Sequence, residues 1–377
     1  MAFSSLRTTS FRNLADAEAD LNGKDIFLIG ENGQGKTNFI EALYFASYGS
    51  SFRGVKDSEL VRSGEKDCSV TVKIDHQLYS GISVILRDGK KNIVLDGKRV
   101  EDRKNLLSIA PCIVFCHEDM EFVTGTPERR RWFFDQTQSL PDPLYLQDLQ
   151  NYRKILKTRN SLLKNDPNRR SSGRISAENS ALLDALDPQL VQYGLQLMEK
   201  RRREVQTFSG IFEPLYRSIS GLDGISISYI PSWKDENSET VLDELLGRRE
   251  TDYSFGLTMS GPHRDRYLFT RKNSSRGTAE FSGRASTGQR RLLALLLRIA
   301  QSRIFSEKTG KAPVLLLDDV LLELDGEKRK KFLSLMPDYD QAFFTFLPEE
   351  PYNLYRKKDT MVYLVQSGNL KKEGNFP

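Results

Sequence analysis

The feature that most constrains the fold of this chain is the segment GENGQGKT at residues 30–37. It fits the pattern G-x-x-x-x-G-K-[ST], a loop that binds phosphate where it follows a strand and opens a helix. The preceding residues, KDIFLI, predict a buried strand, and the following residues, TNFIEALYFASYG, predict a helix. A purely structural strand-turn-helix has no need of a lysine at position 36. The segment therefore predicts a phosphate-binding site in an α/β fold.

The residues of this loop have distinct expected roles. Glycines allow backbone N–H groups to surround a β-phosphate, Lys36 pairs with the β- and γ-phosphates, and the Thr37 hydroxyl ligates Mg²⁺. Lys36 is therefore also a candidate catalytic residue. The candidate nucleotide-binding residues are Gly30, Glu31, Asn32, Gly33, Gln34, Gly35, Lys36, Thr37 and Asn38.

A second apolar run, VLLLDD at residues 314–319, predicts a buried strand that ends in two carboxylates. In a phosphate-loop protein, Asp318 is placed to bind Mg²⁺ and Asp319 to orient the attacking water, which makes Asp319 a candidate catalytic residue. The alternative is a strand that simply ends in a turn, where Asp is common. More than a domain's length of chain separates Thr37 from Asp318. We therefore expect one nucleotide-binding lobe assembled from both termini, with the middle of the chain inserted as a second lobe.

The segment STGQRRLLALLLRIAQ, from Ser286 onward, predicts a buried helix with a polar start. A helix N-terminus carries partial positive charge and free N–H groups, so it can bind an anion. The phosphate loop of the same chain already supplies groups around its own β-phosphate. We therefore expect Ser286, Thr287, Gly288 and Gln289 to contact the γ-phosphate of an ATP that another copy of the chain holds.

The middle of the chain is predicted to be mainly helical. Long helices are expected from about residue 142 to 164 and from 177 to 208, with a basic linker at 165–174. The expected division is an ATPase lobe of residues 1–127 and 260–377 and a helical lobe of residues 128–259. Candidate DNA-contacting cations, each as easily part of a solvated helix face, are Lys154, Lys157, Arg159, Arg169, Arg170, Arg174 and Lys200 to Arg203.

Composition sets wider limits on the class of protein. The net charge of +5 is compatible with a polyanionic partner without requiring one. The three cysteines show no zinc-type spacing, which favours reduced thiols. No apolar run is long enough to cross a bilayer, so we expect a cytoplasmic protein without a membrane partner.

Several segments together resemble the RecF family of DNA replication, repair and recombination proteins, within the ABC-type ATPases. They occur in the family's order over residues 11–329, and STGQRR and LLLDDVLLELD resemble the signature loop, the Walker B strand and the D-loop (Leu324 and Asp325) of that class. The segments are FRNL, GENGQGKTNFIEALYF, GTPERRRWFFD, YRKILKTRNSLL, SGPHRDR and LLLDDVLLELDGEKR.

The resemblance implies an ABC-type P-loop ATPase head related to SMC heads, with ATP and Mg²⁺ as cofactors. It implies an ATP-dependent homodimer that binds single- and double-stranded DNA at gap junctions and is released by slow, DNA-stimulated hydrolysis. It implies roles in DNA replication, recombination, gap repair and the SOS response to DNA damage, with RecR and RecO as partners. By the same resemblance Arg12, in FRNL, reaches a phosphate of the nucleotide, although composition alone equally suits a surface arginine.

Three positions depart from the family pattern. Arg266 stands where a second acid usually follows GPHRD, His117 begins HED where the family commonly has Pro-Glu-Asp, and Thr287 replaces a longer polar residue. Two alternatives remain open at this point. A monomeric P-loop phosphotransferase would show no ATP-dependent assembly, and a scaffold with a vestigial site would be insensitive to Lys36→Ala.

Overall fold

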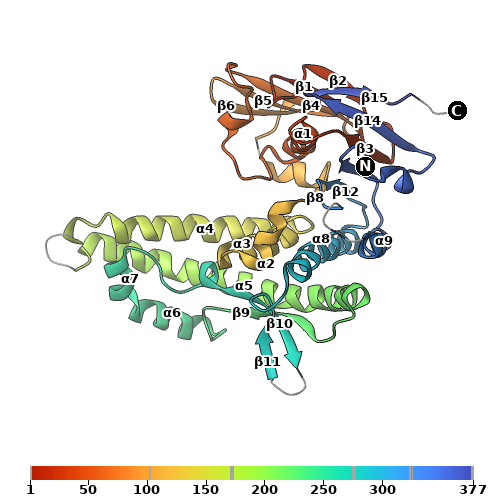
Figure 1. Cartoon of the computed structure of the whole chain (residues 1–377). Coiled ribbons are helices and arrows are strands. Elements are labelled where there is room, and N and C mark those ends of the chain that lie inside the picture. The colour runs from red at the N-terminus through yellow and green to blue at the C-terminus, as the bar shows by residue number, and fades with distance from the viewer. Residues whose placement is uncertain are drawn as a thin grey trace. The chain divides into compact units, whose positions relative to one another are not determined.

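A computed structural model of the chain describes residues 2–101, 103–169, 174–273, 277–321, 324 and 326–374. The chain divides into two compact units (Figure 1). One unit comprises Met1–Met120 with Ala294–Pro377, and the other comprises Glu121–Leu293. Among the described residues, none of the helices combines the length and the apolar character needed to span a bilayer.

Within the described residues, the first unit contains two six-stranded sheets. One is antiparallel, with tight turns at Asp88-Gly89 and Asp96-Gly97, where all four residues have a positive φ. The strands of this antiparallel sheet, in spatial order, are β2 (Ala17–Asp20), β1 (Ala2–Thr9), β4 (Cys68–Asp75), β5 (Gly81–Arg87), β6 (Lys90–Leu95) and β7 (Lys98–Arg99).

The other sheet of this unit is parallel except for one edge strand, and it joins segments from both ends of the chain. In spatial order its strands are β15 (Asn369–Lys372), β14 (Thr360–Gln366), β3 (Asp25–Ile29), β13 (Gln341–Phe346), β12 (Val314–Leu317) and β8 (Cys112–Phe115). Every residue of β3, β13, β12 and β8 is buried, as expected for a parallel sheet covered on both faces.

Helix α1 (Lys36–Tyr48) packs between the two sheets, so its side chains are buried nearly all round. The same unit contains α9 (Gly326–Ser334) and the short 3-10 turns η1 (Asp57–Leu60), η2 (Arg103–Ser108), η3 (His117–Met120) and η6 (Tyr352–Tyr355). Helix α8 (Thr287–Thr309) begins in the other unit and ends in this one.

A single buried amide ties the first strand of the chain to the C-terminal sheet. Gln341, the first residue of β13, is fully buried, and its Oε1 accepts a hydrogen bond from Phe3 N at 2.8 Å. Its Nε2 donates to Phe3 O at 3.0 Å and to Leu21 O at 2.6 Å. One amide group therefore bonds to β1 and to the residue that follows β2. This pairing fixes the antiparallel sheet against the parallel one.

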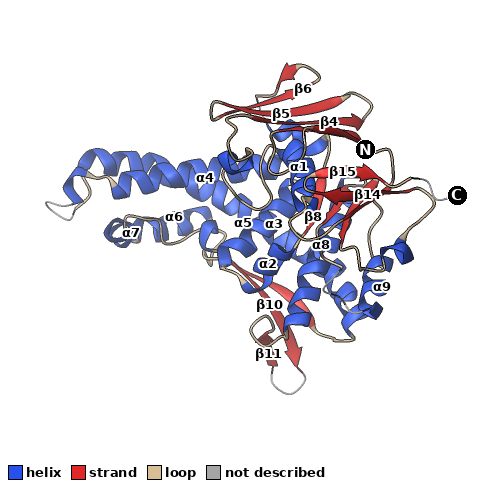
Figure 2. Ribbon diagram, turned by 45° about the horizontal axis from the view of Figure 1, so that its top comes forward, coloured by secondary structure: helices blue, strands red, loops and turns tan. Residues whose placement is uncertain are grey.

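The second unit is mainly helical within its described residues. Helices α4 and α5 lie side by side as a long pair (Figure 1). Its helices are α2 (Glu121–Thr124), α3 (Pro127–Ser139), α4 (Pro143–Lys164), α5 (Ala177–Ser220), α6 (Ser238–Gly247) and α7 (Arg249–Phe255), with short turns η4 (Pro167–Arg169) and η5 (Pro262–Arg264). The unit also contains a small sheet of β11 (Gly277–Glu280), β10 (Arg266–Asn273) and β9 (Ile225–Ile230), of which Figure 2 labels β10 and β11.

The predicted end of the second long helix at Phe208 is wrong. Helix α5 continues through Pro214 and ends at Ser220, and the next residue, Gly221, has a positive φ and caps the helix. The apolar stripe explains the extension, because Phe212, Leu215 and Ile219 continue the buried face at helical spacing. The free energy gained by burying these side chains therefore exceeds the cost of the backbone hydrogen bond that Pro214 removes.

The compact units divide the chain at different places from the predicted lobes. Residues 260–293, which the sequence assigned to the ATPase lobe, cluster with residues 121–259. Strand pairing accounts for this difference, because β10 pairs along its length with β9, from Arg266↔Ile230 to Arg271↔Ile225. The motif SGPHRDR therefore belongs structurally to the helical unit.

Two of the arginines proposed as DNA contacts are instead buried structural cations. Arg159 is fully buried, and its guanidinium donates to Asp187 at 2.8 Å and to Asp252 at 2.7 Å. Arg201 donates to Asp135 at 2.7 Å and to Asp265 at 2.8 Å. Both proposals were therefore wrong, because a periodic charge pattern cannot distinguish a solvated cation from one paired inside a helical layer.

The other basic residues of this unit differ in their surroundings. Surface acids pair with three of them: Lys200 with Asp148, Arg202 with Glu236, and Arg203 with Glu199. Three of the candidate cations are exposed, Lys154 and Lys157 on α4 and Arg174 just before α5. Arg170 and the side chain of Arg169 lie outside the described residues.

The cations at the start of α3 mainly bond to backbone carbonyls. Arg130 donates to Val123 O at 3.0 Å and Tyr267 O at 3.2 Å, and Arg131 donates to Asp265 O at 2.7 Å. Arg129 forms an exposed ion pair with Glu121. This arrangement joins α3 to β10 within the unit.

The Asp135 carboxylate forms ion pairs with Arg201 and Arg153 within this unit. The Arg264 guanidinium lies 3.6 Å from Met259 Sδ. His263 bonds to Tyr152 Oη at 2.7 Å and Thr258 O at 2.9 Å, as a structural residue of a tight turn. Burial lowers the pKa of His263 to about 4, which keeps the ring neutral at pH 7.

We expect Arg159→Met to lower the free energy of unfolding of this unit by about 3–5 kcal/mol, because it leaves buried carboxylates without their shared cation. Both tryptophans, Trp132 and Trp233, lie in this unit, so tryptophan fluorescence during urea unfolding reports on it. Lys157→Met, an exposed change on the same helix, is the matched control with an expected shift within about 0.5 kcal/mol. Equal stability of the two variants would contradict the assignment.

Candidate nucleotide-binding site

The predicted phosphate loop lies at the carboxyl end of β3 and leads directly into α1. Gly35 has a φ of 115°, a conformation that only glycine adopts without strain. A Cβ at this position would also lie 3.1 Å from Asn13 Oδ1 and 3.2 Å from Leu14 Cδ2. The backbone path and the tight packing of the N-terminal segment therefore both require the glycine of the motif.

The Lys36 side chain folds into the concave side of the loop. It is 3% exposed, and its ammonium donates to Gly30 O at 2.6 Å and Glu31 O at 3.2 Å. These partners are neutral carbonyls, so a buried positive charge remains available within the loop. A phosphate group provides the matching charge, and the residues present therefore fit the β- and γ-phosphates of a nucleotide.

The structure brings together Thr37 and Asp318, which lie far apart in the sequence. Thr37 Oγ1 donates to Asp318 Oδ1 at 2.9 Å. Burial, and secondarily the neighbouring Asp319 carboxylate, raises the pKa of Asp318 to about 7. Hard oxygen donors and a pair of crowded carboxylates suit Mg²⁺, since a divalent cation offsets their mutual repulsion.

Asp319 is held by a residue that the sequence analysis missed. Its φ is 52°, and its backbone N–H donates to Thr345 Oγ1 at 2.7 Å. The Thr345 hydroxyl donates in turn to Asp319 Oδ1 at 2.8 Å. Thr345 follows Phe344 at the carboxyl end of β13, where it is the only polar residue between aromatic side chains in FFTF. That polar position at a strand end is the sequence signal that could have found it.

Other predicted residues surround the loop rather than fill it. The Arg12 guanidinium donates to both oxygens of the buried Glu41 on α1, at 2.9 and 3.2 Å. Glu31 and Asn32 are exposed. Asn38 donates to Asn13 Oδ1 at 2.7 Å, and Asn13 donates to Gly33 O at 3.0 Å. Asn13 is therefore a second supporting residue that the sequence analysis missed.

The segment Ser286–Gln289 forms a capped helix start in the other compact unit. Ser286 N donates to Gln289 Oε1 at 2.9 Å, and Gln289 N donates to Ser286 Oγ at 3.3 Å, which is a capping box. Thr287 and Gly288 are exposed at the helix tip. Leu324 is buried, whereas Asp325, the other expected residue of the D-loop, lies outside the described residues.

Comparisons with known proteins identify the family. The model of the RecF/RecN/SMC N terminal domain matches residues 2–369. The DNA replication and repair protein RecF of Treponema pallidum (strain Nichols) is 43% identical over 95% of this chain and 98% of its own length. The chain belongs to the RecF family. RecF of Clostridium tetani (strain Massachusetts / E88) is 31% identical over 96% of the chain and 97% of its own length.

Solved structures of RecF proteins have the same fold. The recombination mediator protein RecF with ATP, described as acting in the RecFOR pathway, is 28% identical and superposes with a TM-score of 0.85 over 99% of this chain and 98% of its own. An Smc head domain from Pyrococcus furiosus, 17% identical with a TM-score of 0.56 over 99% of this chain and 96% of its own, shares the fold. These likenesses confirm the expected ATPase-head fold with segments from both termini and a helical insertion.

We expect Lys36→Ala to weaken ATP binding roughly 10- to 100-fold, because a hydrogen bond to a charged group contributes about 1.5–3 kcal/mol. Isothermal titration calorimetry with ATP measures the change. Lys66→Ala, which removes an exposed ammonium from the same unit, serves as the control and leaves the affinity unchanged. An unaltered affinity in Lys36→Ala would argue that this loop does not bind the nucleotide.

Proposed function

We propose that the chain is an ATP-gated DNA-binding protein that acts in DNA replication, recombinational repair and gap repair. The observation that carries the proposal is the hydrogen bond between Thr37 and Asp318, which completes a metal-compatible site beside Lys36. Membership of the RecF family supports the repair role, as does the likeness to a recombination mediator that binds ATP. Its expected location is the cytoplasm.

Within this proposal, the residues of the site have different roles. The loop backbone and Lys36 bind the β- and γ-phosphates, while Thr37 and Asp318 hold Mg²⁺. Mg²⁺, when bound, neutralises negative charge on the phosphate oxygens. Asp319 orients the attacking water, and Thr345 holds the Asp319 carboxylate in place through the hydrogen bond from its hydroxyl.

ATP-dependent dimerisation is the proposed switch. The exposed tip of α8, with Ser286 as its cap, offers backbone N–H groups to the γ-phosphate of an ATP bound by a second copy. ADP lacks that phosphate, so hydrolysis removes the anion that holds the two copies together. Slow turnover suits this role, because the carboxylate of Asp319 is one methylene shorter than the Glu common in related ATPases.

DNA is the proposed polyanionic partner, bound near junctions of single and double strands. Lys154 and Lys157 on α4 and Arg174 remain candidate backbone contacts because they are exposed, in contrast to Arg159 and Arg201. Such contacts bind phosphates without reading sequence and weaken with salt. RecR and RecO are the proposed protein partners, by likeness to RecF of the RecFOR pathway.

We expect the Asp319→Asn variant to be a dimer with Mg-ATP and a monomer with Mg-ADP or without nucleotide. Light scattering measures this as a doubling of the molecular mass with Mg-ATP alone. The substitution slows turnover and so preserves the ATP state. Adding Ser286→Arg blocks the helix tip and should abolish the doubling without weakening ATP binding. A monomer under all conditions, despite bound ATP, would instead favour a monomeric P-loop phosphotransferase.

We expect Thr345→Val to reduce ATP hydrolysis about 10- to 100-fold, because a displaced water-orienting group has effects of that size. ATP affinity should change less than about threefold, since Thr345 bonds to Asp319 rather than to the phosphate loop. Thr345→Ser keeps the hydroxyl and should restore hydrolysis. Equal rates in the valine and serine variants would show that the hydroxyl does not position Asp319.

A further inference from the structure

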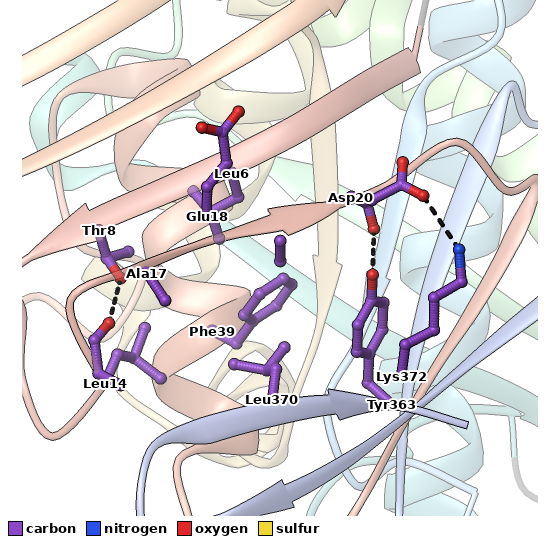
Figure 3. Close-up of a pocket in the computed structure, with 12 residues that line it drawn as sticks. Leu6, Thr8, Leu14, Ala17, Glu18, Asp20, Phe39, Tyr363, Leu370 and Lys372 are labelled. Carbon is purple, nitrogen blue, oxygen red and sulfur yellow. Dashed lines mark hydrogen bonds and ion pairs between the residues drawn. The ribbon is translucent and has the colours of Figure 1, made fainter. Parts of the chain in front are cut away.

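A cavity of about 250 Å³ lies in the first unit between β2 and β15 (Figure 3). Each of these strands is the outermost strand of its own sheet, so each presents an edge that no other strand covers among the described residues. Apolar side chains line much of the cavity, including Leu6, Phe39 and Leu370. The cavity is large enough for one or two side chains of an incoming segment.

The strand along this cavity alternates acidic residues with alanine. Together with Asp16, which precedes it, β2 reads DAEAD at residues 16–20, which stands out in a chain with a net charge of +5. Because Leu6 lies opposite Ala19 and Thr8 opposite Ala17, these small residues share the face of β2 that lines the cavity. Small side chains on that face leave the space open.

Asp16 and the two acids of β2 are half exposed. Asp16, Glu18 and Asp20 have side-chain exposures of 47%, 43% and 47%, and each pairs with a surface cation. Their partners are Arg62, Lys73 and Lys372. Exposed ion pairs of this kind contribute little free energy, so the basic side chains of another molecule can replace the present partners.

We propose that β2 and this cavity form a docking site for an extended, basic segment of a partner protein. An extended segment can pair with an open strand edge through its main chain. Its period of two would place alternate apolar side chains over Ala17 and Ala19 and alternate Lys or Arg side chains beside Glu18 and its acidic neighbours. When the cations of such a segment displace Arg62, Lys73 and Lys372, the three carboxylates favour a basic protein segment over DNA.

The docking site connects to the phosphate loop through short hydrogen-bonded segments. Asn13, just before the strand, donates to Gly33 O at 3.0 Å, and Gly368, just before β15, donates from its N–H to Gln34 O at 2.8 Å. Ala15 N in turn donates to Gly368 O at 2.9 Å. The segments that precede β2 and β15, the two strands beside the cavity, are therefore both hydrogen-bonded to the phosphate loop.

Gly368 is tightly packed against the segment that precedes β2. Its φ is 78°, and a Cβ there would lie 1.8 Å from Asn13 O. A segment that seats in the cavity and moves β2 against β15 must therefore also move the loop. We infer that docking changes the affinity for ATP, a step that rests on the proposed function of the loop, and that ATP changes the affinity for the segment by the same factor.

The test uses the full chain and a library of random 12-residue peptides displayed on phage. Selected peptides are expected to alternate apolar residues with Lys or Arg. Ala17→Phe, which fills the cavity, and Glu18→Lys, which reverses the charge of the edge, should each weaken their binding at least tenfold. Glu65→Lys, an equal charge change at an exposed site outside the cavity, is the matched control and should leave binding unchanged.

Several outcomes would overturn the docking site. Peptides that are acidic, or whose binding ignores both Ala17→Phe and Glu18→Lys, would place the interaction elsewhere. Failure to select any cavity-dependent peptide would also reject it. Nucleotide-independent dimers, seen by light scattering and lost in Ala17→Phe, would identify a second copy of the chain as the occupant instead.

Coupling to the nucleotide has a separate readout. The ATP affinity of the wild-type chain, measured with and without a saturating selected peptide, should differ at least threefold. An unchanged affinity would reject the coupling while leaving the docking site intact. Failure of the free chain to bind ATP at all would reject the proposed function, and peptide binding would still test the docking site by itself.

Discussion

The position of β13 between β3 and β12 is the constraint on which the nucleotide site depends. Parallel pairing puts Leu28 beside Thr345 and Leu317 beside Phe344, so the carboxyl ends of these strands lie at one edge of the sheet. Three segments from distant parts of the chain thereby supply the phosphate loop, Thr345 and the two carboxylates. A shift in either pairing would separate Thr37 from Asp318.

The same constraint explains why the N-terminal sheet forms part of the ATPase unit. Gln341, at the start of β13, uses one amide to satisfy backbone groups of Phe3 and Leu21. Buried backbone groups without partners cost free energy, so this bond makes the packing of the two sheets specific. Helix α1 then has a defined space between the sheets, which orients Lys36 and Thr37 at its first turn.

Buried charge has a different purpose in each unit. In the helical unit, Arg159 and Arg201 are each surrounded by carboxylates, and the resulting networks fix how the long helices pack. In the ATPase unit, Lys36 is buried and its partners among the described residues are carbonyls, and Asp318 lies against another carboxylate. Incomplete neutralisation at the strand ends, in contrast to the balanced networks of the helical unit, is typical of a site prepared for a charged ligand.

The sequence by itself determined the elements whose chemistry is local. The strand-loop-helix around Lys36, the apolar strand before Asp318 and the helix start at Ser286 follow from patterns within a few residues. The family follows from several such segments in a fixed order along the chain. Tertiary structure alone decided which cations are buried, where α5 ends, and that Arg12 bonds to Glu41 while Thr345 holds Asp319. These outcomes depend on contacts between segments far apart in the chain. A local sequence pattern does not show which distant residue will contact a given side chain in the folded protein.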